Sequence, residues 1–247
     1  MNRYTVVTLF PDLITSFRDT GIVRHCVERG LIFVDAINPR EFASDRRLTV
    51  DDAPYGGGPG MVMMVEPLRR AIGVARRRDS RPSHVVYLTP QGRRFDQRSA
   101  CDLRKHEHLI LIAGRYEGID ERIIATDVDS EWSIGDVVLS GGEIPAMLII
   151  DTLVRILPGA LGDARSAEQD SFSDELLDYP HYTRPETVAG DKVPVVLLSG
   201  DHAAIARWRR QQQLGQTYLK RPDLLEGLEL NCADQALLDE FIRALKP

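Results

Sequence analysis

The sequence has few cysteines, and none is placed as a disulfide framework or a metal site requires. Cys26, Cys101 and Cys232 are odd in number, far apart and free of any C-x-x-C spacing, whereas small secreted domains and zinc modules use closely spaced pairs. The six histidines form no H-E-x-x-H or comparable cluster, so we predict no metal-binding residues. This pattern favours a protein of the reducing cytoplasm.

The sequence also lacks a membrane-length apolar run and an excess of positive charge. Its longest apolar runs, such as Ala146 to Ile150, fall far short of the roughly 20 residues of a membrane helix, so we expect no membrane span. Residues Tyr4 to Phe10 alternate like a strand and not like a signal peptide. The formal net charge of -6 argues against a surface coated with positive charge for nucleic-acid binding.

What is present is the composition of a globular chain. Its 247 residues, 43% hydrophobic and 28% charged, suffice for one large domain or two smaller ones. Up to about Gly159, short β-branched runs alternate with helical segments, which predicts an α/β domain with a mostly parallel sheet flanked by helices. The predicted strands are Tyr4–Phe10, Leu31–Ile37, His84–Leu88 and Leu109–Ala113, with a fifth around Ile123–Asp127. The predicted helices are Ile22–Arg29, Pro67–Arg78, Gln97–Lys105 and Glu143–Leu157.

The character of the sequence changes after Pro158-Gly159, which is a helix stop signal. Residues 161–173 are polar, with Gly162, three serines and charges of both signs, and predict a flexible linker. Helical segments follow at 202–214, 222–228 and 233–245. We therefore predict an α/β domain over residues 1–160, a linker over 161–173, and a small all-helical domain over 174–247.

Glycine-rich segments lie near the ends of several predicted strands. Tyr55–Met61 contains three consecutive glycines but fits neither G-x-G-x-x-G nor a phosphate loop ending in Gly-Lys-Ser/Thr. Thr89–Gly92, Ala113–Asp120 and Ser133–Pro145 could converge on one crevice, because ligands of open α/β sheets bind beyond the carboxyl ends of strands. Each could equally be an ordinary turn. A pocket of main-chain groups would suit adenine and a methylthio donor, since neither presents a phosphate.

A basic segment lies near the C-terminus. Residues 203–222 carry five basic side chains and no acidic one. They could form a patch that faces phosphates, although a solvated helix face is the commoner meaning of such a run. We interpret the arginines between Arg69 and Arg81 as a solvated face.

Five long segments resemble, in the right order, the bacterial tRNA (guanine-N1)-methyltransferases. They are Thr49–Met61, Gly114–Gly118, Ser133–Gly142, Leu177–Pro185 and Val196–Gly200, and together they span nearly the whole chain. The resemblance implies the SPOUT superfamily, whose methyl donor, S-adenosylmethionine, lies in a deep trefoil knot formed by the C-terminal part of the first domain. True knots are so rare that periodicity would never predict one. The implied reaction methylates N1 of the guanosine immediately 3′ of the anticodon, position 37, and yields 1-methylguanosine and S-adenosylhomocysteine.

The resemblance also implies a homodimer with its active site at the subunit interface, and it assigns residue roles. One subunit would hold the donor, and the linker of the other would supply a catalytic aspartate, Asp170; Arg155 would contact the guanine or its neighbour. Donor binding would fall to Leu88, Pro90, Gly114, Tyr116, Ile134, Gly135, Asp136, Val137, Val138, Leu139, Gly141 and Pro145. Contacts to tRNA would come from Arg207, Trp208, Arg209, Arg210, Lys220 and Arg221. Val137 departs from the family, because many relatives carry an aromatic residue there.

The chemistry of guanine explains why two such residues are needed. N1 carries a proton and cannot attack a methyl group until a base removes it, while negative charge grows towards O6. An aspartate is a weak base for this task, so Arg155 or a bound cation must make the guanine more acidic. Mg²⁺ is the candidate for such a cation.

Two other functions remain as alternatives. One is an RNA methyltransferase of the same superfamily that acts on a ribose 2′-hydroxyl, against which the segments around Asp170 and Pro180–Pro185 argue. The other is a non-enzymatic nucleic-acid binder with an α/β effector domain, suggested by the basic segment.

Overall fold

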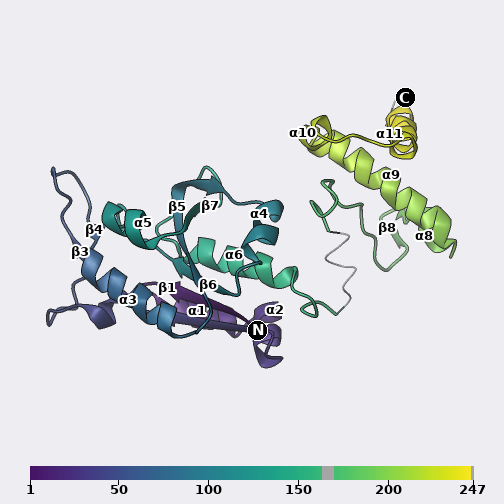
Figure 1. Ribbon diagram of the computed structural model, residues 1–247. Coiled ribbons are helices and arrows are strands. Elements are labelled where there is room, and N and C mark those ends of the chain that lie inside the picture. The colour runs from purple at the N-terminus through teal and green to yellow at the C-terminus, as the bar shows by residue number, and fades with distance from the viewer. Residues whose placement is uncertain (163–169, 246–247) are drawn as a thin grey trace. The chain divides into compact units, whose positions relative to one another are not determined.

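The computed structural model describes residues 1–162 and 170–245 of the chain. The chain separates into two compact units, Met1–Gly162 and Asp163–Pro247, drawn in Figure 1. Residues 163–169 of the predicted linker lie outside the described residues.

Unit 1 is built on a five-stranded parallel sheet with the order β2-β1-β6-β5-β7. Its strands are β1 (Asn2–Val7), β2 (Ile32–Ile37), β5 (Ser83–Arg94), β6 (His108–Ile112) and β7 (Ser130–Ser133). All five residues of β6 are buried, as a strand covered on both faces requires. The predicted mostly parallel sheet is confirmed.

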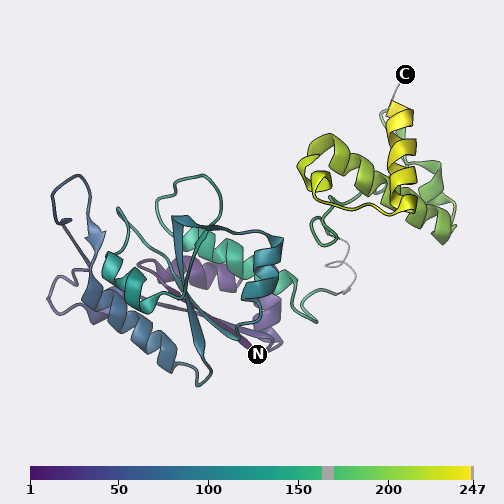
Figure 2. The same cartoon turned by 45° about the horizontal axis from the view of Figure 1, so that its top comes forward.

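Helices cover both faces of this sheet (Figures 1 and 2). One face packs against α1 (Pro11–Arg18), α2 (Gly21–Glu28), α4 (Gln97–Leu103) and α6 (Glu143–Arg155). The other packs against α3 (Val65–Arg77) and α5 (Glu121–Asp127). Alternation along β6 divides the core, because Leu109 and Leu111 face the first layer while Ile110 and Ile112 face the second. The short 3-10 helix η1 (Pro39–Phe42) and the hairpin of β3 (Asp51–Asp52) and β4 (Val62–Met63) precede α3.

The predicted fifth strand is wrong. Residues Ile123–Asp127 lie in helix α5, whose cap residue Asp120 accepts a hydrogen bond from the Arg122 backbone N–H, and Ile123 packs into the core shared with α3. The fifth strand is instead β7, a short polar segment whose side chains gave no alternating apolar signal. A brief run of apolar residues fits a helix as well as a strand, so packing decided between them.

The segment Thr89–Gly92 is not the simple loop that we predicted. Strand β5 continues through it to Arg94, and its pairing with β7 shifts between Leu88 and Arg93. Gly92 permits this, because a Cβ there would collide with the backbone of Trp132. The polar sequence hid a strand whose side chains are largely exposed.

Unit 2 contains helices α8 (Val195–Leu198), α9 (His202–Lys220), α10 (Asp223–Glu226) and α11 (Cys232–Leu245). It also has a hairpin of β8 (Thr187–Val188) and β9 (Asp191–Lys192), which an all-helical prediction did not include. Helix α9 extends past its predicted end at Leu214, and within this extension Gly215 is buried against the Phe241 ring, where a Cβ would collide. Leu176, Leu214 and Leu238 form the small core.

The last residues of the predicted linker, 170–173, form a turn within unit 2. The Phe172 N–H donates to the Leu176 carbonyl at 2.7 Å, and the Asp178 N–H donates to the Ser171 hydroxyl at 3.0 Å. Across the described ranges, no helix has both the length and the apolar character needed to cross a membrane.

Candidate functional site

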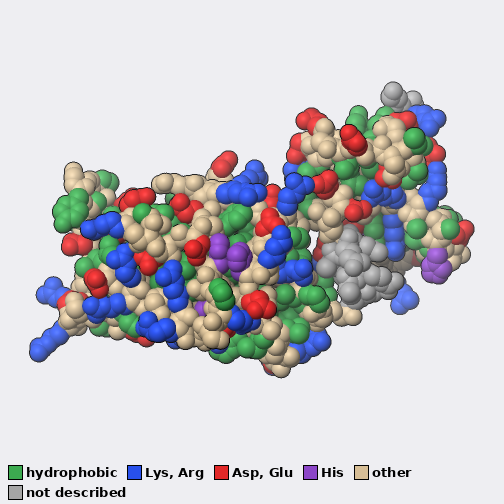
Figure 3. All heavy atoms as spheres, in the orientation of Figure 1, with side chains coloured by type: hydrophobic (Ala, Val, Ile, Leu, Met, Phe, Trp, Pro, Cys, Tyr) green, Lys and Arg blue, Asp and Glu red, His purple; other side chains and the backbone are tan. Residues whose placement is uncertain are grey.

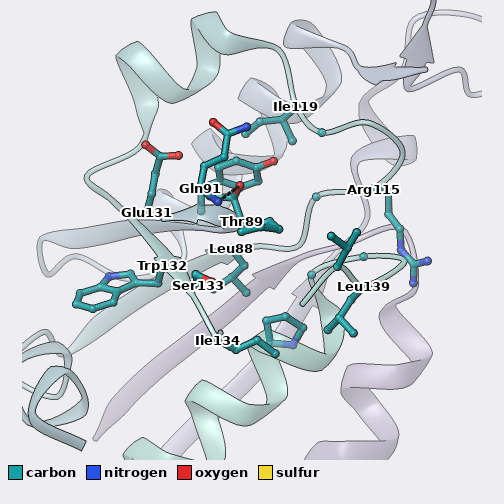
Figure 4. A pocket seen from close by; sticks show the side chains of 18 of the residues that line it. Leu88, Thr89, Gln91, Arg115, Ile119, Glu131, Trp132, Ser133, Ile134 and Leu139 are labelled. Carbon is teal, nitrogen blue, oxygen red and sulfur yellow. Dashed lines mark hydrogen bonds between the residues drawn. The ribbon is translucent and has the colours of Figure 1, made fainter. Parts of the chain in front are cut away.

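A pocket of about 420 Å³ opens in unit 1 at the carboxyl ends of β5, β6 and β7. Its walls are Tyr87–Gln91, Gly114–Ile119 and much of the segment from Glu131 to Gly142 (Figure 4), and Pro145 of α6 also lines it. Pockets for small ligands and cofactors commonly measure roughly 300–1,000 Å³ and lie at this edge of an α/β sheet. The geometry therefore points to a small-molecule site.

The pocket brings together the three segments that the sequence singled out. Of the predicted donor-binding residues, all except Asp136 line it: Leu88, Pro90, Gly114, Tyr116, Ile134, Gly135, Val137, Val138, Leu139, Gly141 and Pro145. Their role stays a prediction, but their convergence is a feature of the fold.

The segment after β6 forms a strained turn. Tyr116 and Gly118 both have positive φ, at 61° and 131°, and the Glu117 N–H donates to the Met61 carbonyl at 2.9 Å. A Cβ at Gly114 would lie 2.9 Å from the Tyr87 ring, so this wall is close-packed. A non-glycine residue in the left-handed region costs free energy and marks a constrained loop.

The segment after β7 forms the opposite wall. The Ser133 hydroxyl donates to the Gly135 carbonyl at 3.0 Å, and the Val137 N–H donates to the same carbonyl at 2.8 Å. The segment then returns to the first wall, where the Gly142 N–H donates to the Gly114 carbonyl at 3.0 Å. A Cβ at Gly142 would lie 2.6 Å from the Ala113 Cα, so only glycine allows this approach.

The pocket lining is rich in main-chain groups and holds few cations. Glu117, Glu121 and Glu131 contribute carboxylates, and Arg115 is the basic residue among the lining side chains. Figure 4 shows Arg115 and Leu139 on one side of the pocket and Glu131 and Trp132 on the other. Main-chain donors and acceptors beside apolar walls suit a neutral heteroaromatic ring better than a polyphosphate.

A smaller hollow of about 290 Å³ lies beside this pocket. It is lined by Leu9, Phe10, Arg40, Arg115, Tyr116, Leu139 and Ser140, so Tyr116 faces both cavities. Burial and the neighbouring Asp51 carboxylate raise the pKa of the Tyr116 hydroxyl, which therefore stays protonated at neutral pH.

Apolar side chains are exposed around the same region of unit 1. Val138 is 87% exposed, and Ile144 and Leu148, which share a face of α6, are 56% and 40% exposed. Phe10 and Leu13, at the start of α1, are also exposed. Exposed apolar side chains gathered in one region are typical of a surface that another molecule covers.

The two predicted catalytic residues belong to different units. Arg155 is the last residue of α6 in unit 1 and is exposed, whereas Asp170 belongs to unit 2, where its carbonyl accepts from the Ser173 N–H at 3.2 Å. Neither lines the pocket of unit 1. Sequence reasoning missed several lining residues, including Tyr87, Glu121 and Trp132, because nothing in a strand or short helix marks which side chains face a pocket.

The predicted tRNA-binding residues divide into two sets. Arg207, Arg210 and Arg221 form ion pairs with Glu240, Asp234 and Asp223, at 2.7, 2.8 and 2.6 Å. Arg209 instead stacks its guanidinium over the Tyr179 ring, 4.9 Å from the centroid, and Trp208 lies beside Tyr182. Lys220 is exposed at the end of α9.

The arginines of the first unit fit the predicted solvated face. Arg69, Arg70, Arg78 and Arg81 each pair with a carboxylate, and Figure 3 shows basic and acidic side chains interspersed on this face of the molecule. No cluster of His, Cys, Asp and Glu suited to a metal ion occurs among residues 1–162 and 170–245.

Comparison with known proteins gives a consistent result. The family model of the tRNA (Guanine-1)-methyltransferase TrmD matches residues 2–227. A protein of Photorhabdus laumondii named tRNA (guanine-N(1)-)-methyltransferase is 56% identical over 238 residues, which cover 96% of this chain and 95% of that protein. A protein of the same name from Yersinia enterocolitica is 54% identical over 242 residues, 98% of each chain.

Proposed function

The chain belongs to the tRNA (guanine-1)-methyltransferase family, part of the SPOUT superfamily, and on that premise we propose that it methylates N1 of guanosine 37 in tRNA. S-adenosylmethionine is the donor, and the products are 1-methylguanosine and S-adenosylhomocysteine. The reaction takes place in the cytoplasm. The observation that carries the proposal is the convergence of three strand-end segments on one pocket in a chain of this family.

The pocket residues fit the donor. Its walls are tight main-chain turns, since a Cβ at Gly114 or Gly142 would meet atoms of Tyr87 or Ala113. Backbone groups of the lining residues between Ile134 and Leu139, which exclude Asp136, and of Gly141 would hold the adenine. Leu88, Pro90 and Pro145 supply apolar walls. When bound, the donor supplies a methyl group on a positively charged sulfonium. Val137 is 53% exposed, and its side chain is smaller than the aromatic residue that the resemblance led us to expect. The main-chain groups of the segment do not depend on that side chain.

The return of the second wall against the first supports a trefoil knot in this region. The Gly142 N–H bonds to the Gly114 carbonyl, and Arg115 forms an antiparallel bridge with Gly141. A segment after β7, at the sheet edge, thus comes back beside the segment that follows β6, near the middle of the sheet.

The proton on guanine N1 has to be removed before the methyl group can be transferred. The Asp170 carboxylate acts as the base that accepts it. Arg155 stabilises the negative charge that grows towards O6, and a Mg²⁺ ion, if bound there, would supply the same kind of stabilisation. Holding N1 in line with the donor methyl group accounts for much of the remaining rate enhancement.

The active enzyme is a homodimer, with Asp170 of one subunit serving the donor pocket of the other. The exposed apolar side chains of unit 1 support this arrangement, because Ile144 and Leu148 of α6 and Leu13 of α1 lie on packed neighbouring helices. Stable dimer interfaces bury such apolar patches.

Unit 2 grips the tRNA. Helix α9 presents the Trp208 ring as a stacking surface and Arg209 as a positive charge. The Tyr182 ring lies beside Trp208, and the Tyr179 ring lies under the Arg209 guanidinium. Further phosphate contacts come from Lys220 and from the exposed parts of the ion-paired guanidinium groups of Arg207, Arg210 and Arg221.

One experiment tests the function directly. The protein is incubated with methyl-labelled S-adenosylmethionine and tRNA transcripts that carry G or A at position 37, and the label is then located by nuclease digestion and chromatography. We expect 1-methylguanosine in the G37 transcript and background label in the A37 transcript. Label on a ribose, or equal label in both, would refute the proposal.

A further inference from the structure

A buried acidic side chain stands behind the pocket wall, outside the set of donor-binding residues. Glu143, the first residue of α6, has a side chain only 2% exposed. Its Oε1 accepts from the Thr8 hydroxyl at 2.7 Å and from Arg115 Nε at 3.2 Å, and its Oε2 lies 2.9 Å from an Arg115 terminal nitrogen. Removing a carboxylate from water is costly unless it is paired, so such a residue needs partners of this kind.

Thr8 extends this cluster to the first strand. It is fully buried just beyond β1, and its hydroxyl donates to Glu143 while it accepts from the Phe10 N–H at 2.9 Å. That turn places the Phe10 ring 4.3 Å from the Arg115 guanidinium, which stacks over it. Glu143 and Phe10 therefore hold Arg115 from two sides.

Arg115 in turn joins the two walls of the pocket. It belongs to the wall that follows β6, and one terminal nitrogen donates to the Ser140 carbonyl of the other wall at 3.1 Å. Its stem passes over Gly141, where a Cβ would collide with it. The spacing between the walls thus depends on the direction in which Arg115 points.

We propose that Thr8 and Glu143 are positioning residues that, through Arg115, set the separation of the two walls and so the affinity for the methyl donor. The inference rests on the proposed function, because it takes that donor to be the occupant of the pocket. Neither side chain is among those lining the pocket, so both act through Arg115.

The test measures donor affinity in variants that keep the shape of the core. Thr8→Val removes the hydroxyl and keeps the volume, and Glu143→Gln removes the charge. We expect each to weaken S-adenosylmethionine binding by about ten- to hundredfold, the range for loss of a hydrogen bond to a charged group. Thr8→Ser keeps the hydroxyl and should bind within about threefold of the parent. Isothermal titration calorimetry gives the affinity, and the KM for tRNA should change far less.

Thr5→Val is the matched control. Thr5 lies in β1, three residues before Thr8, and is also fully buried, but its hydroxyl has no hydrogen-bond partner among the described residues. This variant should bind the donor as the parent does, with an unchanged or higher melting temperature.

The outcomes separate the two proposals. If the unaltered protein binds no donor, the proposed function fails and the inference fails with it. If the parent binds and Thr8→Val binds equally well, or if Thr5→Val and Thr8→Ser lose as much affinity as Thr8→Val, the inference alone is overturned. Should Glu143→Gln not fold, Thr8→Val and Arg115→Lys, which keeps the charge but not the forked donors, decide the matter.

Discussion

At the residue scale, a few backbone positions determine what the pocket of unit 1 can hold. Gly114, Gly141 and Gly142 lie where a side chain would collide with Tyr87, Arg115 or Ala113. They allow two chain segments to approach closely and leave main-chain groups facing the cavity. Main-chain groups placed in this way can bind a ligand without a contribution from basic side chains.

The first prediction concerns the proposed base. Asp170→Asn keeps the size of the side chain but cannot accept the N1 proton, so methyl transfer should fall by about a hundred- to ten-thousandfold. Affinity for S-adenosylmethionine should stay within about twofold of the parent, because the pocket lies in the other unit. Single-turnover kinetics with saturating tRNA measures the rate of methyl transfer, and calorimetry measures the affinity for S-adenosylmethionine.

A neighbouring carboxylate provides the control. Asp174→Asn changes an exposed residue that pairs with Arg210 at 3.3 Å, and it should leave the rate of methyl transfer nearly unchanged. Wild-type turnover in Asp170→Asn would remove Asp170 from the mechanism.

At the element scale, the packing of α9 on α11 supports the small core of unit 2. Gly215 of α9 touches the Phe241 ring, and Arg210 forms a paired contact with Asp234, whose pKa is lowered chiefly by that hydrogen-bonded guanidinium. Arg210 therefore contributes to stability whether or not it also meets tRNA.

The second prediction uses the glycine in this contact. Gly215→Ala should destabilise unit 2 by about 1–3 kcal/mol, because the added methyl group overpacks a close helix contact. Gly73→Ala, in the middle of α3, should instead be neutral or stabilising by up to about 1 kcal/mol, because only the flexible Arg77 end lies near the new methyl group. Differential scanning calorimetry measures the stability of both variants. An equal loss of stability in the two would contradict the close packing of Gly215 against Phe241.

The third prediction concerns β6 and pH. His108 is fully buried, and neither ring nitrogen has a hydrogen-bond partner among the described residues. Burial lowers its pKa, with Asp79 and Asp35 opposing that shift and Arg3 and Arg81 adding to it. Burial and the stacked His106 also lower the pKa of His84.

The sign follows from these shifts. Below the ordinary histidine pKa of about 6.5, the unfolded chain binds protons that the folded chain resists, so the free energy of unfolding should fall as pH drops from about 6.5. His108→Leu should reduce this fall, because it removes the buried imidazole. Urea denaturation at pH 7.5, 6.0 and 5.0 measures the free energy of unfolding. If that free energy fell as steeply with pH in His108→Leu as in the parent, the pH dependence would not come from His108.

At the scale of the whole molecule, the proposed site draws its two halves from two different units of the chain. The donor pocket lies within unit 1, whereas Asp170 belongs to unit 2. A chain whose donor site and base belong to separate units can draw each from a different subunit, and a closed two-fold dimer then contains two complete sites.

The fourth prediction tests this directly by mixing two inactive variants. Asp170→Asn retains the pocket, and Gly142→Val, whose side chain would strike Ala113, retains the base. After subunit exchange the mixture should regain roughly a quarter of the parental activity, because half the dimers are mixed and each has one complete site. Analytical ultracentrifugation of the same samples follows the dimer. Activity that stays at background after confirmed exchange would place both groups in one subunit.

The sequence by itself determined the parallel sheet, most of its helices and the segments that form the pocket. These depend on local signals, since β-branched runs such as Leu109–Ala113 and stop signals such as Pro158-Gly159 act within a few residues. The family was also accessible, because long ordered segments such as Ser133–Gly142 resemble its members.

Only the tertiary structure decided which segment became the fifth strand and which side chains support the pocket wall. Ile123–Asp127 is a helix because it packs against α3, and Thr8 meets Glu143 although 135 residues separate them. Local propensity does not predict such contacts. Their contribution to stability comes from burial and from partners that only the folded chain brings together.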